Sequence, residues 1–139
     1  MEYRRFKNKI FARIDRGEEI ISALKDICMS EGVMLASVSA IGAVNSFTVG
    51  VFSPADKTYS SNCFSGDYEI VSLLGTVTTK NGDFYSHLHM SAGDGQGRVF
   101  GGHLNQAFVS ATCEMVIDIS DGIVDREFND GIGLNLFKF

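Results

Sequence analysis

The sequence has no tryptophan, only one proline and no long apolar run, and these shortages limit what the chain can be. No stretch approaches the ~20 apolar residues that a membrane-crossing helix needs, and the N-terminal segment contains no uninterrupted apolar region typical of a secretion signal. We therefore expect a cytoplasmic protein without a membrane anchor. The 139 residues, 45% of them hydrophobic, suffice for one core and predict a single domain over residues 1–139.

The chain also lacks cysteine pairs and an excess of basic charge. Its three cysteines, Cys28, Cys63 and Cys113, are odd in number and far apart, so we expect reduced thiols and neither a disulfide framework nor a cysteine zinc site. Seventeen acidic residues against twelve basic ones give a formal net charge of −5, which repels a phosphate backbone. Direct DNA binding is therefore not expected.

Periodicity predicts a strand-rich domain with one clear helix. Apolar residues between Ile20 and Cys28 recur at helical spacing, and Gly32 suits the left-handed end of that helix. Asn81 and Gly82 predict a hairpin turn, and a second short helix is expected near residues 104–108. The expected strands cover residues 33–52 (two strands with a bend), 68–79, 83–91, 108–120 and an edge strand within 134–139. This pattern predicts an α/β (α+β) domain with a mainly antiparallel sheet and a few packed helices.

All three histidines of the chain fall within 17 positions. Residues two apart in a strand point to the same face, so His87 and His89 suit convergence on one ion. Gly101 and Gly102 permit a close approach or a left-handed turn that directs His103 toward this pair. Three nitrogen ligands with an open coordination position are typical of catalytic zinc, and the ligand type favours zinc, nickel or iron over calcium or magnesium.

Glu114 is the best candidate for a fourth ligand, or for a hydrogen-bond acceptor behind a ligating histidine. The plainer interpretation is that two histidines in one strand are a surface or core feature, and from spacing alone the two interpretations stand about even. The segment GDGQGR lacks the GK[ST] ending of a phosphate loop and is interpreted as a turn. Strand alternation puts Cys113 on the core face, which argues against a thiol nucleophile.

The sequence resembles the plants-and-prokaryotes-conserved (PPC) domain family over nearly its whole length. The likeness rests on RGEEIISALKDIC, SAIGAV, GDYEIVSLLGTV, HLHMS and GGHLNQAFVSATCEMVI, in the order of the family. The resemblance implies a mainly antiparallel α/β domain, a homotrimer and, in prokaryotic members, a metal site formed by the histidines of HLH and GGHL. Those match His87, His89 and His103 here. The fold is also similar to that of acetolactate decarboxylases, although we identify no arginine-and-carboxylate substrate set.

Plant members of the family add basic AT-hook motifs, and many prokaryotic relatives are consequently labelled DNA-binding proteins. This chain has no such hook. We therefore expect a metal-binding homotrimer that acts as a regulatory or interaction module, with one zinc ion and an unidentified protein or small-molecule ligand. The alternative is a metal-dependent lyase or hydrolase that uses the three-histidine ion as a Lewis acid, with Glu114 as its base. A DNA-binding protein acting through its assembled surface ranks third because of its charge.

Overall fold

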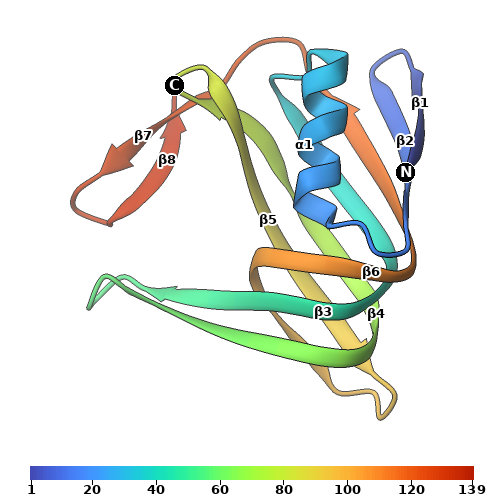
Figure 1. Ribbon diagram of the computed structural model, residues 1–139. Coiled ribbons are helices and arrows are strands. Elements are labelled where there is room, and N and C mark those ends of the chain that lie inside the picture. The colour runs from blue at the N-terminus through green and yellow to red at the C-terminus, as the bar shows by residue number, and fades with distance from the viewer.

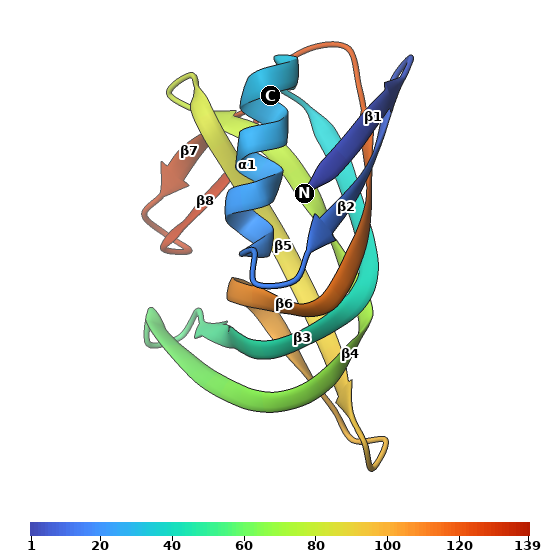
Figure 2. The same ribbon diagram turned by 45° about the vertical axis from the view of Figure 1, so that its right-hand side comes forward.

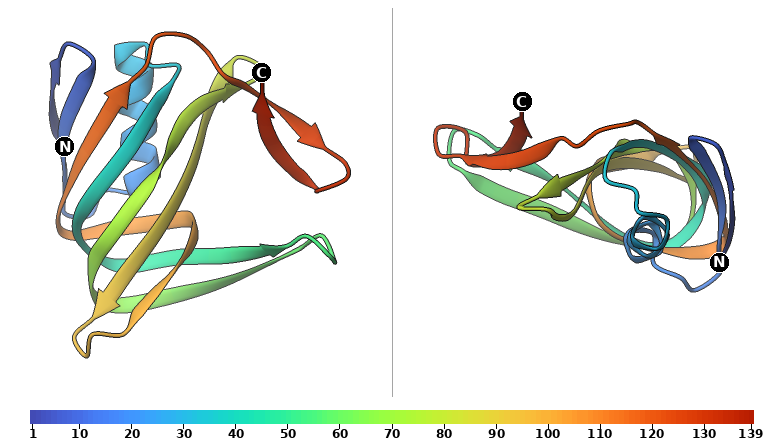
Figure 3. Two further views of the ribbon diagram at one scale, coloured as in Figure 1. Left: turned by 180° about the vertical axis from the view of Figure 1, so that it is seen from behind. Right: turned by 90° about the horizontal axis from the view of Figure 1, so that it is seen from above.

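Six strands form one antiparallel sheet in the computed structural model, which describes residues 1–139 (Figure 1). These strands are β1 (Glu2–Phe6), β2 (Lys9–Asp15), β3 (Ala36–Ser53), β4 (Thr58–Lys80), β5 (Asp83–Asp94) and β6 (Val99–Ile119). They are hydrogen-bonded in the order β1-β2-β6-β3-β4-β5, and a further β5–β6 pairing closes the sheet on itself (Figure 3, right). The predicted fold class, with a mainly antiparallel sheet, is confirmed.

The single helix, α1 (Ile20–Glu31), packs beside the sheet and contacts β5 and β6 (Figure 2). The side chain of Glu19 accepts hydrogen bonds from the first turn, and Gly32 ends the helix in the predicted left-handed conformation, with φ 64°. The buried face of the helix consists of Ile20, Ala23, Leu24, Ile27 and Cys28. The structure contains no helix with the length and apolar character required to cross a membrane.

Two secondary-structure predictions for residues of the main sheet are wrong. Residues 104–108 belong to β6 and form no helix, because Ala107 pairs with Phe47 of β3 and this ladder outweighs local helix propensity. Residues 36–53 form one bent strand, with register shifts between Ala40 and Gly42 and again further along. One long bent strand, β3, therefore replaces the two shorter strands expected over residues 33–52.

The core lies between the helix and the sheet and contains 27 buried apolar residues. Phe47 is among its largest fully buried side chains, and its ring stacks on Phe64 with centroids 4.9 Å apart. Core truncations of this kind cost ~3–5 kcal/mol. The core therefore holds β3 and β6 firmly in the positions from which the site is built.

The last two strands, β7 (Asp125–Asn129) and β8 (Leu134–Lys138), form a separate hairpin. The expected strand at the C-terminus exists, but it pairs only with β7 and is no edge of the main sheet. The hydroxyl of Thr79 donates to Asp125 Oδ1 (2.8 Å), and this contact ties the hairpin to the end of β4. Figures 1 and 3 show the hairpin on the same side of the molecule as the joined ends of β3 and β4, and Lys57 Nζ in that turn donates to the carbonyl of Asp130 (2.6 Å).

Candidate metal centre

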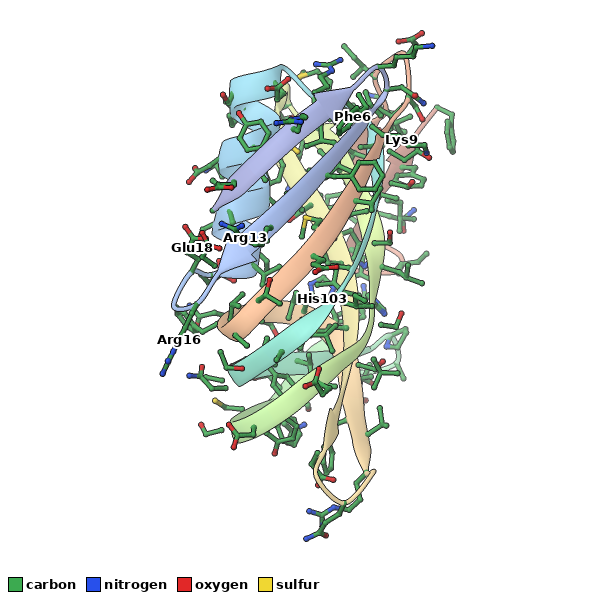
Figure 4. The ribbon with its side chains drawn as sticks, turned by 90° about the vertical axis from the view of Figure 1, so that its right-hand side faces the viewer. Phe6, Lys9, Arg13, Arg16, Glu18 and His103 are labelled. Atoms are coloured by element: carbon green, nitrogen blue, oxygen red, sulfur yellow. The ribbon has the colours of Figure 1, made fainter.

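The three histidines lie together where β5 meets the first part of β6. His89 is the Cα partner of His103 in the β5–β6 ladder, and His87 lies two residues earlier on the same face of β5. The ring centroids of His87 lie 5.2 Å from His89 and 5.1 Å from His103. One ligand nitrogen from each histidine lies within 4.8 Å of the other two. Figure 4 shows that His103 lies apart from Phe6 and Lys9 of the N-terminal hairpin.

Gly101 and Gly102 bring His103 into place by close approach of two backbones. Both residues lie inside β6, and neither has a positive φ, so no left-handed turn is present. A Cβ atom at Gly101 would lie 2.7 Å from the carbonyl oxygen of Met90, and one at Gly102 would lie 2.6 Å from that of Gly50. A side chain at either position would therefore push β6 away from β5 or β3 and displace His103.

The surroundings of His87 and His103 favour the neutral imidazole. Burial, followed by the charges of His103, Arg126 and His89, lowers the pKa of His87 from 6.5 to about 4. Burial and, secondarily, His89 also lower the pKa of His103. No histidine takes part in an ion pair. Because a neutral ring keeps a free lone pair, His87 and His103 are ready to bind a metal at neutral pH.

Glu114 is not brought to the histidines within one chain. It is exposed on β6, opposite Arg13 of β2 and Ile41 of β3. It lines a different cavity of about 680 Å³ and is absent from the group of converging ligand atoms. Glu114 follows His103 by eleven positions in the same strand, β6, and a strand rises about 3.3 Å per residue, so the two side chains are far apart. Strand alternation indicates only the face on which a side chain lies.

The histidines open into a cavity of about 920 Å³ between the main sheet and the β7–β8 hairpin. Its walls are largely apolar or aromatic, and they include Val51, Phe52, Tyr85, Leu134 and Phe137. No aspartate, glutamate or lysine lines it. A molecule in this cavity would meet three imidazoles on one side and the hairpin on the other.

Arg126 of β7 also lines this cavity, although no sequence motif singles it out. The residue is buried, and its Cζ atom lies 4.7 Å from the ring centroid of Tyr85 and 4.5 Å from that of Phe137. In the sequence it stands between Asp125 and Glu127, a pattern typical of a solvated turn. Strand alternation in β7 is the only local signal that turns Arg126 inward, away from its acidic neighbours.

The buried cysteines have no nucleophilic character. Burial raises the pKa of Cys28 to about 12. Burial and, to a lesser extent, Glu114 raise the pKa of Cys113 to about 12 as well. Since the thiolate is the reactive form, these thiols are inert packing groups at neutral pH, in agreement with the core position predicted for Cys113.

Comparison with known proteins agrees with the motifs and the fold. The family model of the Plants and Prokaryotes Conserved (PCC) domain matches residues 1–120. A candidate DNA-binding protein from Bacteroides thetaiotaomicron has a similar structure, with TM-score 0.96, 30% identity and coverage of 99% of this chain and 96% of the other. No curated protein matches the sequence significantly.

Two archaeal structures are also similar. A PPC protein from Pyrococcus horikoshii has TM-score 0.87 and 30% identity, with 99% of this chain and 94% of the other covered. A metal-containing protein from Archaeoglobus fulgidus has TM-score 0.88 and 31% identity, with 99% and 97% covered. The likeness therefore extends over nearly the whole length of each of these proteins.

Proposed function

This chain belongs to the Plants and Prokaryotes Conserved domain family, and we propose that it is a metal-binding, homo-oligomeric regulatory or interaction module. One divalent transition ion, zinc, is bound per subunit by His87, His89 and His103. The observation behind this proposal is that three imidazole nitrogens lie within 4.8 Å of one another. The metal-containing relative from Archaeoglobus fulgidus, 31% identical, gives independent support.

The donor set suits zinc. In a tetrahedral site with Zn–N bonds of about 2.0–2.1 Å, the ligand nitrogens are about 3.4 Å apart. The three nitrogens here lie within 4.8 Å of one another, so small side-chain rotations would bring them to that spacing. Three protein ligands leave a fourth position open toward the cavity. When bound, zinc supplies a Lewis acid there.

Elemental analysis and metal titration of the full chain test this proposal. We expect about one zinc ion per subunit, and we expect nickel and iron to compete for the same site. A protein that binds none of these three metals would overturn the proposal. Magnesium, which prefers oxygen ligands, serves as the negative control.

The oligomer in this proposal is a homotrimer, as the resemblance implies. The outer face of the sheet supports it, because Ile41 and Leu74 are each 59% exposed and Val71 is 56% exposed. All three residues line, with Phe11, the cavity of about 680 Å³ that also contains Glu114, and exposed apolar side chains gathered in one place favour burial against another subunit. Sedimentation velocity at micromolar concentration should give a trimer, and a monomer would contradict this part of the proposal.

A second candidate function is that of a metal-dependent lyase or hydrolase. The cavity of about 920 Å³ next to the histidines favours it, because a small molecule there would face the open coordination position. A metabolite screen with the zinc-loaded protein separates the two functions. Turnover that depends on the histidines establishes an enzyme, and binding without turnover favours the module.

The cysteines support a cytoplasmic location for this protein. All three are free, and Cys63 is exposed. An exposed free thiol is more typical of a reducing compartment than of an oxidising one. Fractionation of cells that produce the tagged chain tests this location.

A further inference from the structure

Arg126 is a buried cation without a counter-ion. Only 5% of the residue is exposed, and none of the ion pairs of the chain involves it. The cavity that it lines contains no carboxylate. Burying an unpaired charge is costly, so a fold that retains one here leaves a strong attraction for an anion.

The hydrogen bonds of Arg126 are incomplete. A guanidinium group has five N–H donors. Arg126 Nε donates to Thr78 Oγ1 (2.8 Å), Nη1 to the carbonyl of Asn135 (3.0 Å) and Nη2 to Thr76 Oγ1 (3.4 Å). The rings of Tyr85 and Phe137 pack on the same group. Two N–H donors therefore remain without a protein partner, in a side chain that its neighbours hold in place.

We propose that this cavity binds a small organic acid whose carboxylate pairs with Arg126. The planar guanidinium matches a carboxylate, and the apolar walls near Val51 and Leu134 suit a short hydrocarbon chain. A single arginine among apolar walls favours a monoanion over a phosphate. The inference deepens the proposed function, because the ligand would lie beside the three histidines, but the pairing with Arg126 requires no metal.

The test uses butanoate as the probe and neutral butanamide as its matched control. Each is titrated into the ¹⁵N-labelled full chain, once treated with EDTA and once loaded with zinc, while the Arg126 Nε–H resonance is followed by NMR. We expect the acid to shift this resonance in both states and to bind at least about 10-fold more tightly than the amide. Equal binding of acid and amide, or tighter binding of inorganic phosphate, would overturn the proposal.

Substitution supplies the second arm of the experiment. Arg126→Gln should weaken binding of butanoate at least about 10-fold, whereas Arg16→Gln, at an exposed position on the edge of the molecule, should not change it (Figure 4). Undiminished binding by a folded Arg126→Gln protein would contradict the inference. If that variant does not fold, the comparison of acid and amide on the unaltered chain decides. If zinc fails to bind but Arg126-dependent acid binding remains, the metal proposal fails and this inference stands.

Discussion

His89 lies directly opposite His103 in the very ladder that closes the sheet, so one set of backbone hydrogen bonds both completes the fold and sets the site. Opposed residues of an antiparallel pair keep their Cα atoms about 4.5–5.5 Å apart. The spacing of these two imidazoles is therefore a property of the backbone. Removing either side chain should remove a ligand while leaving the strands that hold the others.

We expect His89→Ala and His103→Ala each to lower zinc affinity about 100-fold or more, because each variant removes one of three ligands. Competition against a coloured chelator measures the change. Cys63→Ala is the control, since Cys63 is an exposed residue of β4 outside the histidine group and should leave the affinity unchanged. Histidine variants that bind zinc as well as the unaltered chain would show that the ion, if any, is bound elsewhere.

Glu114→Gln should leave zinc affinity within about 3-fold of the unaltered chain. The sequence suggested a fourth ligand or a supporting acceptor at this position, whereas the structure places Glu114 on a different cavity, opposite Arg13. Second partners of metal ligands typically contribute 10–100-fold to affinity, so the two interpretations are well separated. A loss of 10-fold or more in the same chelator assay would restore Glu114 to the site.

The metal-free protein should protonate His87 only near pH 4, because burial, its largest cause, lowers the pKa of this residue from 6.5 to about 4. Between these values the unfolded chain binds more protons at this residue than the folded one. The free energy of unfolding should therefore fall as the pH drops through this window, and His87 should contribute no pH dependence above it. An NMR titration of the His87 ring that inflects near pH 6.5 would contradict this expectation.

Gly102→Ala should destabilise the protein by about 1–3 kcal/mol and weaken zinc binding at the same time. The added Cβ would lie 2.6 Å from the carbonyl oxygen of Gly50, so β6 must shift and His103 must move with it. Gly95→Ala is a matched control, because a Cβ there meets nothing within 4 Å. Urea denaturation and zinc titration of both variants measure the difference. Equal behaviour of the two would show that close approach at Gly102 is unimportant.

The isolated chain should show no tight, sequence-specific DNA binding. Its net charge is −5, and it has no basic AT-hook segment to offset the repulsion. Fluorescence anisotropy with a labelled pool of duplexes at physiological salt measures the affinity. Nanomolar binding with clear sequence preference would contradict the expectation, and it would agree with the label of the relative from Bacteroides thetaiotaomicron.

Local patterns were sufficient to predict α1, the turn at Asn81 and Gly82, and the shared face of His87 and His89. Each of these depends on spacing within a few residues, where helical and strand periods act directly. Asn81 and Gly82 indeed adopt positive φ, at 55° and 83°. Such features need no knowledge of which strands become neighbours.

Features that depend on distant partners were not predictable. The pairing of β5 with β6 arises from strand order, which no local period encodes. Alternation in β7 indicates that Arg126 points inward, but not that it faces the histidines, because that depends on where the hairpin packs. Glu114 illustrates the limit from the other side. Alternation correctly puts Glu114 on the face of β6 opposite the core residue Cys113. It does not show that this face, at Glu114, lines a cavity separate from the histidines.

The cavity beside the histidines has two walls, one from the main sheet and one from the β7–β8 hairpin, and the two walls come from different parts of the sequence. The histidines lie within the residues 1–120 that the family model matches, whereas Arg126 and Asn135 lie beyond that span. The hairpin is a sheet of its own, so residues 125–138 can be exchanged without breaking the ladder between β5 and β6. Proteins made by grafting other hairpins onto this six-stranded sheet would then keep the three histidines and differ in the side chains that face them across the cavity.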